Sequence, residues 1–199
     1  MPNWVDNKLT VTGPREEIDK LRDKPFLAET YVPIPEELRC TKRVGYSSPE
    51  RYRFDPKGRS PEELRRDWEN LEWIPLTESE VRRLEEQYGA ADAWEWVLIH
   101  WGTKWDFDDV RIEEIEGGIV YLFNTAWSPP LPVLWVLTSL FPSLNFHLYY
   151  VDIQMPFEGV YEIQSREELR DDRWEPEFYG PDGEFLENAK LHGPEGDAP

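Results

Sequence analysis

The sequence predicts an α+β domain, and three local patterns in the 199-residue chain carry that prediction. A β-branched, alternating segment at residues 8–12 precedes a segment with helical periodicity at residues 15–23. Two strand-like segments, residues 109–116 and 119–125, are joined at Gly117-Gly118, which favours a hairpin. A further helix is expected from Ser128 to about Phe141, because serine is a common helix cap and the two prolines that follow suit a first helical turn.

The first two elements are expected to form a β–α unit. Lys8 to Thr12 alternates polar and apolar residues, and Gly13-Pro14 ends the strand. In the helix that follows, Ile18 and Leu21 share one face, and acidic residues near its start suit the helix dipole.

Residues 25–79 are less regular and are interpreted as an insertion into the domain. Tyr31 to Pro35 is expected to be extended or at a sheet edge, because its prolines cannot donate to a ladder. Ser60-Pro61-Glu62-Glu63 predicts the start of a helix that runs to about Asn70. Insertions of this kind often carry binding specificity.

Two helices are predicted next. Thr77-Glu78-Ser79-Glu80 has the form of a capping box, and Gly89 closes the helix that it opens. One face of this helix holds Val81, Leu84 and Tyr88. The second helix spans residues 90–100, with a stripe formed by Ala91, Trp94, Leu98 and Trp101.

The remaining segments complete the sheet. Both faces of residues 119–123 are apolar, which indicates a central strand. Strands are expected at 145–152 and 160–164, and a flexible acidic tail at 180–199. Without the insertion, the order is βαββαβ plus one extra strand, the ferredoxin-like split βαβ plan. We therefore predict a single ferredoxin-like domain over residues 1–179, with a partly irregular basic insertion at about 25–79.

The cysteine content and the apolar stretches of the chain indicate the cellular compartment of the protein. Cys40 is the only cysteine, so neither an internal disulfide nor a cysteine-based zinc site is expected. The N-terminal residues lack the basic start and apolar run of a signal peptide, and no apolar stretch approaches the ~20 residues that span a bilayer. The sequence therefore predicts a cytoplasmic protein without membrane contact.

The chain is strongly acidic, with a formal net charge of −19. The favoured interpretation is solubility, and a sharper one is a protein that mimics nucleic acid and occupies a basic site on a partner. The exception is the window 39–66, with nine Lys/Arg against four Asp/Glu. Aromatic residues interleave its cations, as in single-strand nucleic-acid contacts, and the candidate residues are Lys42, Arg43, Arg51, Arg53, Lys57 and Arg59. The favoured alternative is that this arm neutralises the acidic body.

Several longer motifs resemble one family: Met1 to Trp4, Asn7 to Gly13, Trp101 to Asp106, Phe123 to Pro130 and Phe157 to Glu162. The chain resembles the YubB-type ferredoxin-like domain family, whose members are borne on phages, plasmids and other mobile elements. The resemblance covers residues 1–13 and about 90–165. It implies a ferredoxin-like fold and a mobile-element setting, and it implies no activity, because the family has no established one.

The two tryptophan motifs are predicted to lie at one end of the sheet, because a short hairpin brings Asp106 and Trp127 together. The favoured interpretation is a tryptophan cluster that locks two helix–strand junctions, with Thr103 and Ser128 as helix caps. The alternative is a binding pocket, with candidate residues Trp101, Thr103, Lys104, Trp105, Asp106, Thr125, Trp127 and Ser128.

No catalytic constellation is apparent in the sequence. Ser128 lacks the glycine pattern of a nucleophile elbow, the three histidines are far apart, and the aspartates after Trp105 lack a calcium-loop layout. No catalytic residue, metal site or cofactor is predicted, and binding is favoured over catalysis.

The expected function is that of a mobile-element accessory protein that binds a host or mobile-element protein through its acidic surface, and so inhibits a nucleic-acid-binding protein of the host or of a rival. Two alternatives stay open. One is a nucleic-acid-associated module that uses the basic arm, and the other is a small-molecule pocket at the tryptophan motifs.

Overall fold

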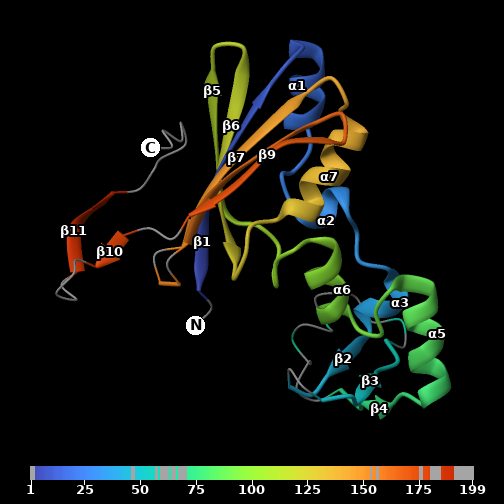
Figure 1. Cartoon of the computed structure of the whole chain (residues 1–199). Coiled ribbons are helices and arrows are strands. Elements are labelled where there is room, and N and C mark those ends of the chain that lie inside the picture. Colours follow the sequence, from blue (N-terminus) through green and yellow to red (C-terminus); the bar gives the residue numbers. More distant parts are fainter. Residues whose placement is uncertain are drawn as a thin grey trace. The chain divides into compact units, whose positions relative to one another are not determined.

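The structure is a computed structural model. It describes residues 3–45, 48–56, 58, 63, 66, 71–152, 154–155 and 157–174, together with the backbone of two C-terminal strands. The chain divides into two compact units. The first combines Met1–Val32 with Trp101–Pro199, and the second is Pro33–His100 (Figure 1).

The first unit is built on a six-stranded antiparallel sheet in the order β5-β6-β1-β7-β8-β9. Its strands are β1 (Trp4–Thr12), β5 (Asp108–Ile115), β6 (Gly118–Ala126), β7 (Asn145–Asp152), β8 (Phe157–Gln164) and β9 (Glu167–Trp174). Helix α1 (Arg15–Arg22) follows β1, and α7 (Leu131–Leu140) follows β6. The sequence β1-α1-β5-β6-α7-β7 is the βαββαβ plan of a ferredoxin-like fold, so the predicted fold class is confirmed.

Strands β8 and β9 extend the sheet beyond β7. One extra strand was predicted, and β9 was not. Its sequence is almost entirely charged, so it lacks the apolar alternation that indicates a strand. Such residues are typical of an edge strand, where charged side chains hinder pairing with other chains.

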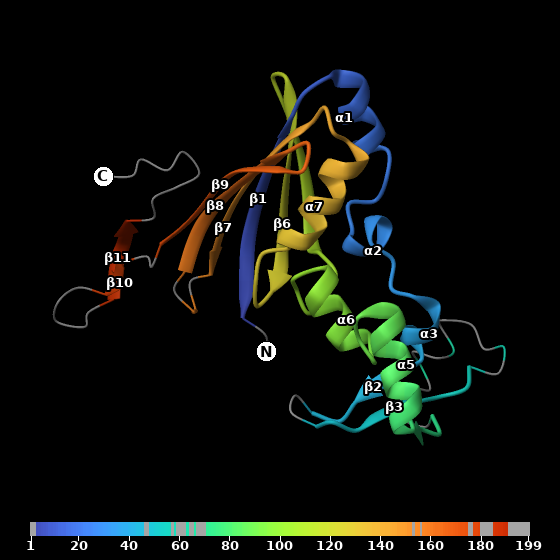
Figure 2. The same cartoon turned by 45° about the vertical axis from the view of Figure 1, so that its right-hand side comes forward.

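Both views place α1, α7 and the short helix α2 (Ala28–Tyr31) on one side of the sheet (Figure 1, Figure 2). Alternate residues of β1, Val5, Leu9 and Val11, are fully buried on that side. Phe26, between α1 and α2, stacks on Tyr121 of β6 with ring centroids 3.9 Å apart. The main core of the unit therefore lies between the helices and one face of the sheet.

The opposite face of the sheet carries a mixed surface. The strand register puts Asp6 and Lys8 on it, because they alternate with the core residues of β1. Tyr149, Val151 and Val160 form a smaller buried cluster on this face, and Trp174 packs against it. This face therefore has an apolar centre and charged surroundings.

The hairpin between β5 and β6 turns at Glu116 and Gly117, one residue earlier than predicted. Gly117 has a φ of +74°, which favours glycine. Gly118 is already part of β6, and a Cβ atom there would lie 2.5 Å from the carbonyl oxygen of Val11. The two glycines therefore have separate roles, one in the turn and one in the close approach of β1.

The acidic excess is concentrated in the first unit, which holds 26 Asp and Glu against 11 Lys and Arg. Much of it lies on the two edge strands, as Asp108, Asp109, Glu113, Glu114, Glu167, Glu168, Asp171 and Asp172. Charged edges discourage sheet-to-sheet association. Part of the net charge therefore protects the two edge strands of the sheet from pairing with other chains.

In the second unit, the structure describes a three-stranded sheet in the order β2-β3-β4 and the helices α3, α5 and α6. These elements are α3 (Glu36–Arg39), β2 (Thr41–Arg43), β3 (Arg51–Arg53), β4 (Ile74–Pro75), α5 (Glu78–Tyr88) and α6 (Ala93–His100). The predicted capping box is confirmed, since the Glu80 amide donates to Thr77 Oγ1 at 3.3 Å and the Thr77 amide donates to Glu80 Oε2 at 2.9 Å. Gly89 ends α5 with a φ of +75°.

Helix α6 begins at Ala93, three residues later than predicted. Asp92 accounts for this start, because its Oδ1 accepts the Glu95 amide at 2.8 Å in the manner of an N-cap. The helix buries Trp96 and Val97, whereas Trp94 and Leu98 of the predicted stripe are only half-buried.

The second unit spans residues 33–100, whereas the insertion was predicted at about 25–79. Residues 26–31 pack in the first unit through Phe26 and Tyr31, whose ring centroids lie 6.2 Å apart. Tyr31 ends a helix rather than starting the extended segment that was predicted, because an acceptor far along the chain satisfies the first amides of α2. At its C-terminal boundary, the second unit includes α6, because α6 contacts β2 and the residue before α6 forms an ion pair with β2, as described below.

The C-terminal region contains β10 (Glu177–Tyr179) and β11 (Phe185–Lys190), which pair in an antiparallel sheet. The segment 180–199 was predicted as a tail without strands, so β11 corrects that prediction for six of its residues. The helix predicted over 60–70 lies almost entirely outside the described residues. No helix within the described ranges has both the length and the apolar character needed to cross a membrane.

Candidate functional site

The two tryptophan motifs meet at one end of the six-stranded sheet, as the sequence predicts. Thr103 Oγ1 donates to the carbonyl oxygen of Ala126 at 2.9 Å and accepts the Ala126 amide at 3.0 Å. The Lys104 amide also donates to Ala126, and the Ser128 hydroxyl donates to the carbonyl oxygen of Gly102. These bonds join the segment before β5 to the segment after β6.

A buried hydrogen-bond chain extends this junction to β1. Asn7 Nδ2 donates to Thr125 Oγ1 at 2.9 Å, and Thr125 Oγ1 donates to the carbonyl oxygen of Ser128 at 2.9 Å. Thr103 and Ser128 were predicted as helix caps, and this prediction is wrong. The cap position of α7 is Pro130, whose side chain cannot form a cap bond, and the hydroxyls of Thr103 and Ser128 bond between the two motifs instead.

We expect Thr125→Val to destabilise the first unit by about 1–3 kcal/mol, because a valine of similar shape leaves the Asn7 amide and the Ser128 carbonyl without their buried partner. Urea unfolding measures the effect. Thr12→Val is the control, since Thr12 is a half-buried β1 residue outside this chain of bonds. Equal stability of the two variants would contradict the assigned role.

Asp106 is a structural acceptor. Its carboxylate accepts the amides of Ala28 at 2.6 Å, Glu29 at 3.2 Å and Phe107 at 2.8 Å. It therefore satisfies the first amides of α2, which a helix cannot bond internally. Burial raises the pKa of Asp106, and the three amide bonds act in the opposite direction.

The three tryptophans of the motifs differ in exposure. Trp101 is buried, and its Nε1 donates to the carbonyl oxygen of Val32 at 2.7 Å. Trp105 is 44% exposed, and Trp127 is half-buried. The ring of Trp105 lies 5.8 Å from that of Trp4, at the start of β1. Trp101 therefore belongs to the core, whereas Trp4, Trp105 and Trp127 reach the surface.

Lys104 lies between two indole rings. Its Nζ is 4.8 Å from the ring centroid of Trp105 and 4.5 Å from that of Trp127. An ammonium group over an aromatic face is attracted by the ring quadrupole. We call Trp4, Lys104, Trp105 and Trp127 the tryptophan patch. Trp4 was not among the predicted site residues, although its place at the end of the N-terminal motif, Met1 to Trp4, was a usable signal.

Trp127 has a strained backbone, with a φ of +77°. Such a conformation costs a bulky residue roughly 1–3 kcal/mol and persists only where its surroundings impose it. Here the Trp127 amide donates to the carbonyl oxygen of Asn3 at 2.9 Å, and the hydroxyl bonds of its neighbours hold the turn. The structure therefore maintains strain that directs this side chain.

The candidate nucleic-acid residues lie in the second unit, and two of them are in buried ion pairs. Arg43 Nε lies 2.9 Å and Arg51 Nε 2.5 Å from the same Oδ2 of Asp92. Both guanidinium groups also approach Glu95, at 2.7 and 3.3 Å. The Arg43 guanidinium lies over the Trp94 ring.

Two further cations of the basic arm also face groups of their own unit. Arg53 pairs with Glu80 at 3.0 Å, and Lys42 Nζ lies 3.7 Å from the ring centroid of Trp73. Burial lowers the pKa of Lys42. Lys57 and Arg59 lie outside the described residues. The four described cations are thus engaged within the second unit, which leaves less positive charge for phosphates.

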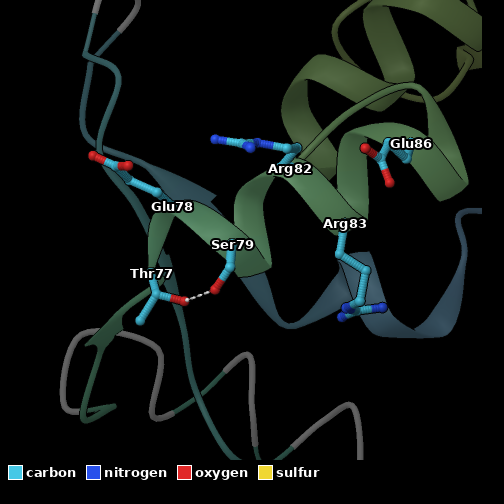
Figure 3. A pocket seen from close by; sticks show the side chains of 6 residues that line it. All are labelled: Thr77, Glu78, Ser79, Arg82, Arg83 and Glu86. Atoms are coloured by element: carbon cyan, nitrogen blue, oxygen red, sulfur yellow. Dashed lines mark hydrogen bonds between the residues drawn. The ribbon is translucent and has the colours of Figure 1, made fainter.

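The surface of the second unit has two hollows that contain polar side chains. One, of about 470 Å³, surrounds the first turns of α5, where the Thr77 and Ser79 hydroxyls bond to each other (Figure 3). The other, of about 510 Å³, contains Cys40. Burial, with the negative charges of Glu36 and Asp55, raises the pKa of its thiol, which disfavours the reactive thiolate. Within the described residues, no group of three or more His, Cys, Asp or Glu side chains could hold a metal ion.

Comparisons with known proteins bear on the fold. Residues 100–190 match a family model described as a ferredoxin-like domain in Api92-like protein. The crystal structure of a protein api92 from Yersinia pseudotuberculosis is similar with a TM-score of 0.50 and 10% sequence identity, over 87% of this chain and 98% of that chain. No curated protein matches the chain in sequence. At this identity the likeness establishes a shared fold, in agreement with the strand order.

Proposed function

We propose that the chain is a protein-binding module of a phage or plasmid, acting in the cytoplasm, and that the tryptophan patch is its contact surface. The resemblance of its motifs to the YubB-type family supports the mobile-element setting. The exposure of Trp105 carries the proposal of a contact surface. The Trp105 ring lies 5.8 Å from the Trp4 ring and shares Lys104 with Trp127, so partly exposed indoles gather at one end of the sheet.

The composition of the patch suits a protein interface. Tryptophan is among the residues that contribute most binding energy at interfaces, since it buries a large area with few rotatable bonds. The bonds between Thr103 and Ala126 and between Thr125 and Ser128 hold the patch in place, so little ordering entropy is lost on binding.

The charge of the first unit indicates the character of the partner. With 26 acidic against 11 basic residues, the unit attracts positively charged surfaces and speeds encounter with them. A basic protein, such as one that binds nucleic acid, is the partner that this field favours. Occupation of its basic site by this chain would inhibit it.

Trp105→Ala is expected to weaken partner binding at least about tenfold, which corresponds to ~1.4 kcal/mol. Affinity capture from a bacterial lysate, followed by titration of the captured protein, measures the change. Trp135→Ala is the matched control, because Trp135 is 37% exposed on α7, away from the patch. Capture of the same proteins by wild type and the Trp105 variant with equal affinity would refute the proposed surface.

The two alternative functions have less support. The nucleic-acid alternative needs the cations of the basic arm, and Arg43 and Arg51 are already bound to Asp92 and Glu95. The small-molecule alternative needs polar groups at the tryptophan motifs, and Asp106 is already bound to three amides. Fluorescence anisotropy with single-stranded DNA and RNA tests the first, since binding at low salt would restore it.

A further inference from the structure

A third hollow, of about 460 Å³, lies on the sheet face opposite the helices. Strands β1, β6 and β7 and the start of β5 line it. Leu122 and Val151 provide apolar walls, and Asp6, Lys8 and Asn124 provide polar ones. The register of β5 shifts between Asp108 and Arg111, which brings its first residues to the edge of the hollow.

The two ends of the hollow differ in charge. Arg111 is paired with Asp109 at 2.5 Å, so the pair adds little net charge. Lys8 lies opposite Leu122 of β6 and Tyr149 of β7. Asp6 lies two residues along β1, opposite Asn124 and Val151. The hollow therefore has a cationic end at Lys8 and an anionic end at Asp6.

The Asp6 carboxylate at the anionic end is repelled by a second carboxylate, which lies outside the hollow. Burial and the negative charge of Asp152 raise the pKa of Asp6. Asp152 is fully buried and does not line the hollow, because it alternates along β7 with Val151, the residue opposite Asp6. Its Oδ1 accepts the amides of Gln154 at 2.7 Å and Met155 at 3.0 Å, whereas its Oδ2 has no hydrogen-bond partner among the described residues. A cation placed beside Asp6 would relieve this repulsion.

We infer that the Asp6 end of this hollow takes the lysine or arginine side chain of a partner protein. The aliphatic part of such a side chain packs on Leu122 and Val151, while its charged group pairs with Asp6. Trp4 of the tryptophan patch lies two residues before Asp6 on the same face of β1, so the patch and the hollow are neighbours along that strand. This inference rests on the proposed function for the class of the partner. It adds that the partner contributes a lysine or arginine side chain.

The test uses the full chain and two small probes, N-acetyl-arginine amide and its neutral isostere N-acetyl-citrulline amide. Titration is followed by amide chemical shifts in nitrogen-labelled protein. With the arginine probe, shifts are expected at residues 5–8, 122–124 and 149–151, and with the citrulline probe they are expected to be absent. Asp6→Asn is expected to weaken the arginine response at least about tenfold, because it removes the pairing charge.

Glu113→Gln is the matched control, since it removes one exposed negative charge from β5 outside the hollow. The control is expected to bind the arginine probe like wild type, and the spectrum of Asp6→Asn without probe shows whether it is folded. Equal shifts with both probes, an unchanged response of Asp6→Asn, or shifts confined to other residues would each overturn the inference. Partner capture that depends on Trp105 would still stand in that case, so the two proposals fail separately.

Discussion

Replacement of Asp92 by alanine is expected to destabilise the second unit by about 3–5 kcal/mol, the usual cost of removing one member of a buried ion pair. Asp92 is fully buried, and it bonds three different elements. Its Oδ2 holds Arg43 of β2 and Arg51 of β3, and its Oδ1 caps α6 through the amide of Glu95. The alanine variant leaves two nearly buried guanidinium groups without their shared carboxylate.

Hydrogen exchange read by mass spectrometry distinguishes the two units of the chain. Peptides from β2, β3 and α6 are expected to lose protection in the Asp92 variant, while peptides from β1 and β6 serve as an internal reference. Glu86→Ala is the matched control, because Glu86 is an exposed acidic residue on α5 of the same unit. Protection within about 1 kcal/mol of wild type would show that the network contributes little, as many exposed ion pairs do.

Phe26→Ala is expected to destabilise the first unit by about 3–5 kcal/mol, the range for truncating a buried phenylalanine. The ring of Phe26 is buried and stacks on Tyr121. It also lies 5.3 Å from the rings of both Phe107 and Phe123. A cavity in the middle of this aromatic group would separate the segment before α2 from the sheet.

Guanidinium unfolding and hydrogen exchange of β6 peptides measure this effect. Phe26→Leu retains most of the apolar volume, so its cost is expected to stay below about 1.5 kcal/mol if its neighbours repack. Leu140→Ala is a control at an exposed apolar position of α7. If the alanine variant at position 26 were no less stable than the leucine variant, the stacking of Phe26 on β6 could not be a main contact of the core.

Local patterns in the sequence predicted elements whose stabilising groups are close in the chain. The capping box at Thr77 and the hairpin before Gly118 depend on residues within a few positions of each other, and both are present. The meeting of the two tryptophan motifs also followed from one short hairpin. Strand β9 escaped prediction, because an edge strand is not required to have an apolar face.

Exposure within the tryptophan-rich centre could not be predicted in the same way. Trp101 and Trp105 are four residues apart and have similar chemistry, yet only Trp101 meets an acceptor from the loop after α2. Asp106 was a candidate binding residue because it is a polar group next to Trp105 in a possible pocket at the tryptophan motifs. Its acceptor role depends on amides 77 and 78 residues away.

By itself, the sequence determined the βαββαβ order of the ferredoxin-like plan and the position of the tryptophan motifs at one sheet end. The tertiary structure alone decided which side chains remain available for binding. Arg43 and Asp92 are 49 residues apart in the chain, and their ion pair turns a basic arm into an internal network. Periodicity and caps act between neighbours in the chain, whereas burial and pairing depend on contacts that form only when distant segments pack together.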